Sequence, residues 1–178
     1  LQVVMFTSAN PGAGKTFVSS NLAMSIAQTN KKVVLVDVDI RKGTLSGIFS
    51  NSSNRMGLTH YLSGSTDKVD DIVGTSEEYE KLDVIFSGPV PPNPAELLLS
   101  ERFDRLITEL RKRYDYIIVD NVPAGIVADA SIVNRVVDLT IFVVRSGVMD
   151  RRQLPELENM YRQEQLHNLS VILNGVPL

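Results

Sequence analysis

The sequence contains no cysteine, which excludes a disulfide framework, thiol catalysis and a cysteine-ligated metal site. It also lacks long hydrophobic runs, since stretches such as VVLVDVDI and LTIFVV are too short or too interrupted to cross a bilayer. Positive charge is not in excess, because the net charge is -3, so we expect no nucleic-acid partner. The absence of cysteine fits a reducing cytosol.

The length of 178 residues is enough for one α/β domain with a sizeable core and too short for two domains of ordinary size. Hydrophobic residues make up 43% of the chain and charged residues 22%, a composition that favours a folded globular protein. We therefore expect residues 1–178 to form a single domain. Because a strand pattern begins within three residues of Leu1, we also expect this domain to be part of a longer chain.

Short β-branched runs alternate with longer amphipathic stretches, which is the pattern of βαβ units. This pattern predicts an α/β fold with a mostly parallel sheet and helices on both of its faces. Residues 50–54 and 87–94, rich in serine, asparagine and proline, are predicted loops. The predicted strands span residues 3–6, 33–38, 84–86, 116–119, 139–144 and 169–173.

Two helices are predicted from the spacing of apolar residues. Val18, Leu22 and Ile26 recur every four residues and predict one helix face between the first two strands. A second helix is predicted over residues 100–113, and its basic residues 111–113 are interpreted as a solvated helix end that suits the helix dipole. The apolar face of this second helix consists of Phe103, Leu106, Ile107 and Leu110.

The stretch GAGKT follows the first predicted strand and opens a predicted helix. This is the context of a Walker A phosphate-binding loop, in which backbone N–H groups and a helix N-terminus face an anion. Lys15 would reach the terminal phosphates and the Thr16 hydroxyl would bind Mg²⁺. The usual pattern has glycine where this chain has Ala9, which is acceptable if the backbone φ is negative there. We predict that the loop binds a nucleoside triphosphate.

Two acidic side chains, Asp37 and Asp39, stand at the carboxyl end of the second predicted strand. Ligands of open α/β sheets bind at this edge. Two carboxylates beside a bound phosphate need a compensating cation, so the pair predicts a Mg²⁺ site. One carboxylate could hold the metal through water while the other accepts a proton from an incoming hydroxyl.

A third acidic residue, Asp120, ends the apolar stretch YDYIIVD, which is the arrangement of a Walker B aspartate supporting the water shell of the metal. Asn174 follows the last predicted strand and could offer its amide to an adenine edge, although an Asn-Gly pair is also an ordinary turn. His60 and His167 have no ligand-like spacing and are interpreted as surface or loop residues.

These motifs together resemble the bacterial tyrosine kinases (BY-kinases) that govern capsule and exopolysaccharide assembly. The likeness spans essentially the whole chain, with ANPGAGKTFVSSNLA as Walker A, VVLVDVDIRKG as the family's Walker A′ motif and YDYIIVD as Walker B. The segments GLTHYLSG and ILNGV are also similar to the family. GPVPPNPAELL is the most specific of these motifs, because the wider P-loop ATPases do not share it.

The resemblance implies an ATP- and Mg²⁺-dependent protein-tyrosine kinase that phosphorylates itself, on a P-loop NTPase-like fold. By position, Asp37 matches the acidic residue proposed to activate the tyrosine hydroxyl, while Asp39 and Asp120 arrange the metal. The implied catalytic residues are Lys15, Asp37, Asp39 and Asp120. The implied metal-binding residues are Thr16, Asp37, Asp39 and Asp120. The implied nucleotide-binding residues are Gly12, Ala13, Gly14, Lys15, Thr16, Phe17 and Asn174.

The resemblance also implies partners and a location. BY-kinase domains associate into rings at the cytoplasmic face of the bacterial plasma membrane, where a transmembrane polysaccharide co-polymerase, fused or separate, activates them. Their substrate is a tyrosine-rich tail of a neighbouring copy. Residues 1–178 contain neither that tail nor the ring-forming E-x-x-R-x-x-R motif, which lies upstream of Walker A in the family. Two further departures are Thr44, where some members have tyrosine, and Asn121-Val122 after the Walker B aspartate.

The main alternative is a partition or division-site ATPase of the same superfamily, whose hydrolysis times its association with DNA or membrane. Those proteins carry a signature lysine early in the phosphate loop, which reaches the nucleotide of a partner subunit. The aligned residue here is Asn10, and this difference, together with PPNPAELL, favours the kinase. A non-catalytic module that retained nucleotide binding is a third alternative, against which the intact loop and acidic residues argue.

Overall fold

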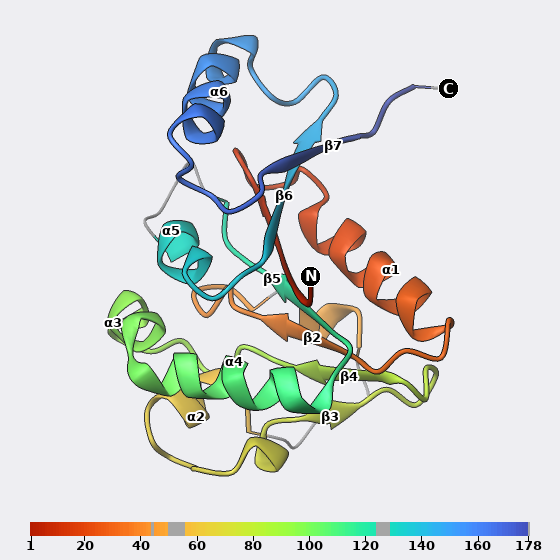
Figure 1. Cartoon of the computed structure of the whole chain (residues 1–178), viewed down its shortest axis with the longest axis vertical. Coiled ribbons are helices and arrows are strands. Elements are labelled where there is room, and N and C mark those ends of the chain that lie inside the picture. The colour runs from red at the N-terminus through yellow and green to blue at the C-terminus, as the bar shows by residue number, and fades with distance from the viewer. Residues whose placement is uncertain (44, 50–55, 124–128, 178) are drawn as a thin grey trace.

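One seven-stranded sheet forms the centre of the protein (Figure 1). The computed structural model describes residues 1–43, 45–49, 56–123 and 129–177. The strands are β1 (Val3–Ser8), β2 (Val33–Asp37), β3 (Gly74–Thr75), β4 (Leu82–Ile85), β5 (Tyr116–Asp120), β6 (Leu139–Arg145) and β7 (Ser170–Asn174). Their order is β3-β4-β2-β5-β1-β6-β7, with every pair parallel except β3–β4. The predicted α/β fold is confirmed.

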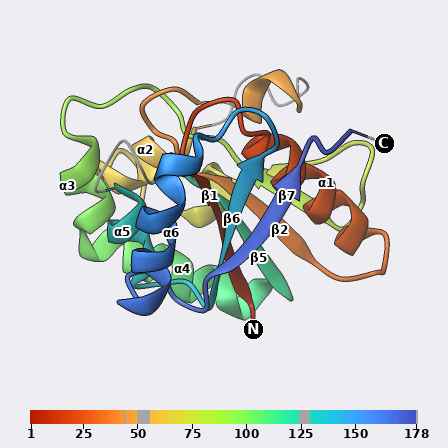
Figure 2. The same ribbon diagram turned by 90° about the horizontal axis from the view of Figure 1, so that it is seen from above.

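Helices cover both faces of this sheet, as expected for parallel strands. The helices are α1 (Lys15–Ala27), α2 (Leu58–Leu62), α3 (Pro94–Leu99), α4 (Glu101–Arg113), α5 (Asp129–Asn134) and α6 (Leu154–Arg162), with short 3₁₀ turns η1 (Leu45–Gly47), η2 (Val69–Asp71) and η3 (Arg151–Gln153). Helix α1 lies on one face, whereas α3, α4, α5 and α6 lie on the other (Figure 2). Among the described helices, none has the length and apolar character needed to span a membrane.

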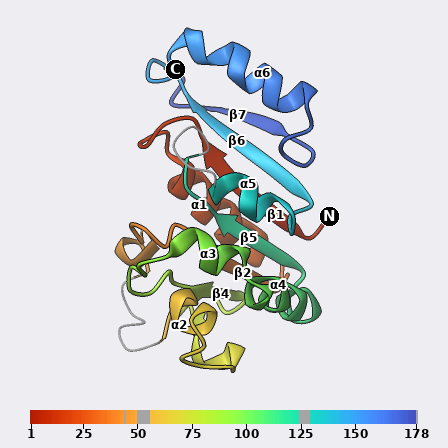
Figure 3. The same ribbon diagram turned by 90° about the vertical axis from the view of Figure 1, so that its left-hand side faces the viewer.

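The core is divided by the sheet into two layers, and successive residues of each central strand enter opposite layers. In β1, Val3 and Met5 pack on the side of α4, while Val4 and Phe6 pack on the side of α1. This two-sided burial explains why the central strands read as continuous apolar runs. The edge strand β7 differs, because each of its five residues is exposed or only half-buried, with Val171 and Leu173 exposed. In Figure 3, β7 and α6 lie together at one end of the sheet.

Helix α1 forms where the sequence predicts it, and its predicted apolar face packs against the core. Val18, Leu22 and Ile26 are only half-buried at the margin of the core. The buried residues of α1 are Lys15, Ser19, Ser20, Ala23 and Ala27. Small side chains let the helix approach the sheet closely, so the largest apolar residues of α1 lie beside the contact rather than within it.

Helix α4 buries its whole predicted face. Phe103, Leu106, Ile107 and Leu110 are each at most 2% exposed. The basic residues at its end are not simply solvated, however. Arg111 forms an ion pair with Asp138 at 2.7 Å, and Arg113 forms one with Asp70. These ion pairs fasten the end of α4 to two other segments of the chain. The predicted loop at 50–54, and Thr44, lie outside the described residues.

Asp138 fixes the start of β1. Its carboxylate accepts the Arg111 guanidinium at 2.7 and 3.0 Å and the backbone N–H groups of Gln2 and Val3 at 2.8 Å each. Hydrogen bonding from Arg111 is the main reason why the pKa of Asp138 lies well below its usual range. A lowered carboxyl pKa stabilises the fold at pH values above the unfolded-state pKa, and this contribution is lost as the pH falls below it.

We therefore expect Asp138→Asn to lower the free energy of unfolding by about 1–3 kcal/mol at pH 7, because charge-assisted hydrogen bonds are lost. The deficit relative to wild type should shrink as the pH falls below about 4. Urea unfolding at pH 7, 5 and 3 measures both effects. Asp150→Asn is the control, because its Arg152 partner is 89% exposed and little change is expected. Equal effects of the two substitutions would contradict the role given to Asp138.

Candidate active site

The loop between β1 and α1 has the backbone of a phosphate-binding loop. Gly12 and Gly14 have φ values of 78° and 87°, the left-handed region that favours glycine. At Gly14 a Cβ would also overlap Nδ2 of Asn174, so the Asn174 side chain would have to shift. Ala9 has no positive φ, so alanine is acceptable at this position, as predicted. The loop therefore keeps glycine only where the backbone requires it.

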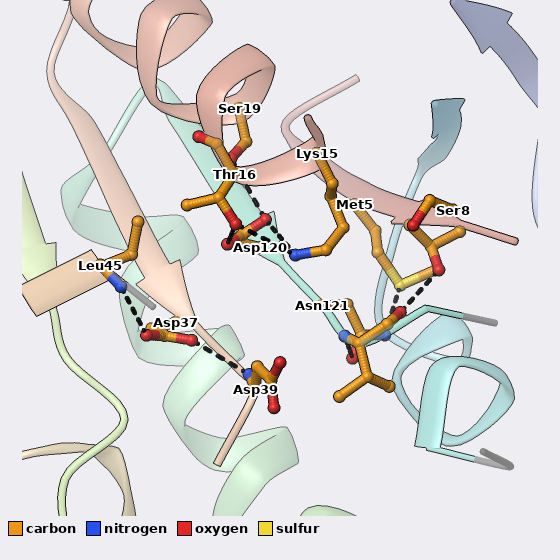
Figure 4. Close-up of polar contacts among 12 residues, drawn as sticks. Met5, Ser8, Lys15, Thr16, Ser19, Asp37, Asp39, Leu45, Asp120 and Asn121 are labelled. Carbon is orange, nitrogen blue, oxygen red and sulfur yellow. Dashed lines mark hydrogen bonds and ion pairs between the residues drawn. The ribbon is translucent and has the colours of Figure 1, made fainter. Parts of the chain in front are cut away.

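Lys15 and Thr16 both contact the Walker B aspartate (Figure 4). The Lys15 Nζ lies 2.7 Å from Oδ1 of Asp120, and the Thr16 hydroxyl donates to Oδ2 at 2.8 Å. The Lys15 side chain is 8% exposed and that of Asp120 0%. Sequence reasoning missed Ser19, whose hydroxyl donates to Asp120 at 3.2 Å. Its position one helical turn after Lys15 is the signal that could have identified it.

The second acidic motif lies on the neighbouring strand. Asp37 and Asp120 are register partners at the carboxyl ends of β2 and β5. The Asp37 carboxylate accepts the backbone N–H groups of Asp39 and Leu45, each at 3.1 Å. Asp39 in turn accepts the N–H of Lys42 at 3.2 Å. The structure thus brings the three predicted acidic residues to one edge of the sheet.

Burial raises the pKa of Asp37 to about 7. This value already includes smaller increases from the charges of Asp120 and Asp39 and the opposing effects of the Leu45 N–H and the Lys15 ammonium. In the ligand-free protein the Asp37 carboxyl therefore changes charge close to neutral pH. A bound cation would favour its ionised form.

A pocket of about 420 Å³ follows the phosphate loop. Its size is typical of a small-molecule site. Arg41 and Lys42 also line it and add positive charge, and the Phe17 side chain, 65% exposed, contributes to the wall. The remaining lining residues are Ser8, Pro11, Gly12, Ala13, Gly14, Lys15, Thr16, Asp39, Val122 and Pro123. A polyanion such as a nucleotide phosphate chain matches the N–H groups and cations of this lining.

The acidic residues do not form a closed metal site by themselves. Within residues 1–43, 45–49, 56–123 and 129–177, no three histidine or carboxylate side chains converge closely enough to hold an ion. Mg²⁺ commonly takes only one or two protein carboxylates and completes its octahedral shell with phosphate oxygens and water. The hydroxyl and carboxylate oxygens at the loop fit such a shared site. The assignment of Thr16, Asp37, Asp39 and Asp120 to the metal stays a prediction.

Asn174 contacts the loop rather than open solvent. Its Nδ2 donates to the carbonyl of Ala13 at 3.0 Å. The predicted adenine contact stays a prediction, whereas this loop contact was not expected from the sequence. Asn10, which replaces the signature lysine of partition ATPases, donates its amide to Gln153 of η3 at 3.0 Å.

The departure after Walker B also has a structural role. Asn121 is fully buried, and its Oδ1 accepts the N–H of Val122 at 2.8 Å. The Thr7 hydroxyl donates to the carbonyl of Val122 at 2.7 Å, which joins this segment to β1. The two histidines lie elsewhere. The ring of His60, on α2 rather than in a loop, accepts the N–H of Gly57, and the ring of His167 contacts the carbonyl of Val137.

Residues 1–147 match the family model described as an AAA domain. Tyrosine-protein kinase CpsD of Streptococcus pneumoniae is 40% identical over 178 residues, which is 100% of this chain and 78% of that protein. The chain belongs to the bacterial tyrosine-protein kinases. This confirms the resemblance inferred from the motifs, and the P-loop ATPase fold of the kinase family implies nucleotide binding.

Solved structures agree with the assignment of this chain to the bacterial tyrosine-protein kinases. The kinase domain of Escherichia coli tyrosine kinase ETK has a TM-score of 0.89 and 38% sequence identity, covering 98% of this chain and 68% of that chain. The septum site-determining protein MinD of Pyrococcus horikoshii has a TM-score of 0.76 at 21% identity, covering 97% of this chain and 69% of that chain. The likeness to MinD shows the fold alone, so the partition or division-site alternative is only a distant structural relation.

Proposed function

We propose that this chain transfers the γ-phosphoryl group of ATP to tyrosine hydroxyls, including those of a tyrosine-rich tail on a neighbouring copy, in the control of capsule or exopolysaccharide synthesis. One observation gives the main support for placing the active site here. Lys15 and Thr16 both contact Asp120, and Asp120 lies directly beside Asp37 in the sheet register. These contacts support the proposal that Lys15 binds phosphate, Thr16 binds the metal and Asp37 acts as the base within one site.

In the proposed reaction the phosphate loop binds the nucleotide through its backbone N–H groups and Lys15. The Asp37 carboxylate accepts the proton of the tyrosine hydroxyl as the tyrosine oxygen bonds to the γ-phosphorus. The bond from that phosphorus to the β–γ bridging oxygen breaks, and ADP leaves. Lys15 stabilises the charge that spreads over the phosphoryl oxygens, and its low exposure keeps water from weakening this interaction.

Magnesium would be held by Thr16 and the acidic residues of the site together with phosphate oxygens, and would neutralise charge on the phosphate chain. Asp39 and Asp120 support this shell. The proposed partners are a transmembrane activator of the polysaccharide co-polymerase type and further copies of the kinase in an oligomer. These partners would place the kinase at the inner face of the bacterial plasma membrane. The assignment of residues 1–178 to one kinase domain is part of the same proposal.

The decisive experiment supplies ATP, Mg²⁺ and a tyrosine-rich peptide to the purified chain. We expect phosphotyrosine on the peptide, formed in step with ADP, and none when EDTA removes the metal. A matched peptide with phenylalanine in place of tyrosine is the control and should stay unmodified. ATP hydrolysis stimulated by DNA or lipid, without any phosphotyrosine, would refute the proposal and favour a switch ATPase.

A further inference from the structure

The phosphate loop is held from one side by the C-terminal third of the chain. The Arg145 guanidinium donates to the carbonyl of Gly12 at 2.9 Å, and Asn174 donates to the carbonyl of Ala13 at 3.0 Å. Arg145 and Asn174 are register partners in the last rung of the β6–β7 ladder. Two adjacent side chains at the end of two paired strands therefore bind two consecutive carbonyls of the loop.

A hydrogen bond to one of these carbonyls also orients an N–H group. In a trans peptide unit the C=O of one residue and the N–H of the next lie in one plane and point in opposite directions. Fixing the carbonyl of Gly12 toward Arg145 therefore directs the N–H of Ala13 the other way. The same argument links the carbonyl of Ala13, held by Asn174, to the N–H of Gly14. These N–H groups belong to the set that a phosphate-binding loop presents to its anion.

The peptide that Arg145 holds begins at a glycine. Gly12 has a left-handed φ of 78°, and a Cβ built there would meet nothing within 4 Å. Because glycine has no Cβ, its backbone has more conformational freedom than that of other residues. Gly14 differs, because Asn174 fills the space that its side chain would occupy. A hydrogen bond to the Gly12 carbonyl therefore limits a conformational freedom that the residue itself leaves open.

We propose that Arg145 is a positioning residue for nucleotide binding, which acts through the Gly12 carbonyl to hold the Ala13 N–H toward the phosphate chain. This inference rests on the proposed nucleotide site. In this role the charge of the guanidinium only strengthens its hydrogen bond to the carbonyl. Arg145 therefore acts on the diphosphate portion that ADP and ATP share, rather than on the γ-phosphate alone.

The test measures ADP and ATP dissociation constants by calorimetry for wild type, Arg145→Ala and Arg145→Lys. We expect Arg145→Ala to weaken both nucleotides by a similar factor, about 3- to 10-fold, the range for losing one hydrogen bond. Arg145→Lys should recover most of the affinity, because an ammonium can donate to the same carbonyl. The KM for ATP should rise with little change in kcat, and the melting temperature should stay near that of wild type.

Arg162→Ala is the matched control, since Arg162 is an exposed residue of α6 that pairs with Glu158. It should leave both dissociation constants unchanged. Unaltered affinity in Arg145→Ala would overturn the inference, and so would a loss for ATP that far exceeds the loss for ADP, which would indicate a direct charge contact with the γ-phosphate. Wild type that binds neither nucleotide would refute the proposed function itself. Wild type that binds both without forming phosphotyrosine would refute the kinase reaction and leave the role of Arg145 standing.

Discussion

Lys15→Met is expected to lower the rate of phosphotyrosine formation at saturating ATP by about 100-fold or more. In phosphoryl transfer the protein contributes mainly positioning and charge stabilisation, and Lys15 is the cation that the loop places at the site. Its side chain is 8% exposed, so solvent water cannot replace the missing charge effectively. Initial rates of phosphotyrosine formation on a tyrosine-rich peptide provide the measurement.

The same substitution removes the cation beside Asp120, which is fully buried, so a fall in the melting temperature is also expected. The double variant Lys15→Met/Asp120→Asn separates the two effects, because it removes the buried charge as well. It should recover stability while remaining inactive. Lys31→Met, in the exposed segment between α1 and β2, controls for loss of a positive charge and should keep full activity. A Lys15→Met enzyme that retains a tenth of the wild-type rate would contradict the role given to Lys15.

Asp37→Asn should also lower phosphotyrosine formation by about 100-fold, with the affinity for metal-free ADP close to that of wild type. The amide has nearly the shape of the carboxylate but cannot accept the hydroxyl proton. Asparagine can still accept one of the two N–H groups, from Asp39 and Leu45, that hold the carboxylate. Because burial disfavours the ionised form of Asp37, removing the charge should offset much of the lost hydrogen bonding.

Asp83→Asn is a matched control on the neighbouring strand β4. Asp83 accepts the hydroxyl of Tyr114 at 2.7 Å, a contact that belongs to the packing of α4 on the sheet. Its substitution should affect stability and leave the kinase rate per folded molecule unchanged. An active Asp37→Asn combined with an inactive Asp39→Asn would transfer the role of the base from Asp37 to Asp39.

The sheet and its acidic edge could be predicted because they depend on local patterns. The central strands are buried on both faces, so they read as apolar runs, and each run ends where its side chains become polar. Parallel strands place their carboxyl ends at one edge, and this alone brings Asp37 and Asp120 together. The glycines of the loop could also be predicted, because a backbone with positive φ strongly favours glycine.

Other features depend on contacts between distant parts of the chain, which no local pattern encodes. The buried small residues of α1, such as Ser19 and Ala23, were missed because they carry no hydrophobic signal. In the sequence, Arg145 is an ordinary basic residue at the end of a strand, and only the structure shows its contact with the loop. Lys112 and Arg113 are exposed, as predicted, but the ion pair of Arg111 was missed for the same reason, since Asp138 lies 27 residues away.

The contacts from Arg145 and Asn174 to the loop also have a consequence for biosynthesis. They join residues separated by 133 and 161 positions, so the phosphate loop leaves the ribosome well before the strands that complete it. A nascent chain that ends before β7 has the glycines and Lys15 but lacks the Asn174 contact that holds the loop. Such long-range closure is slow compared with local helix formation. We therefore expect a nascent chain to bind nucleotide only after β7 has paired with β6.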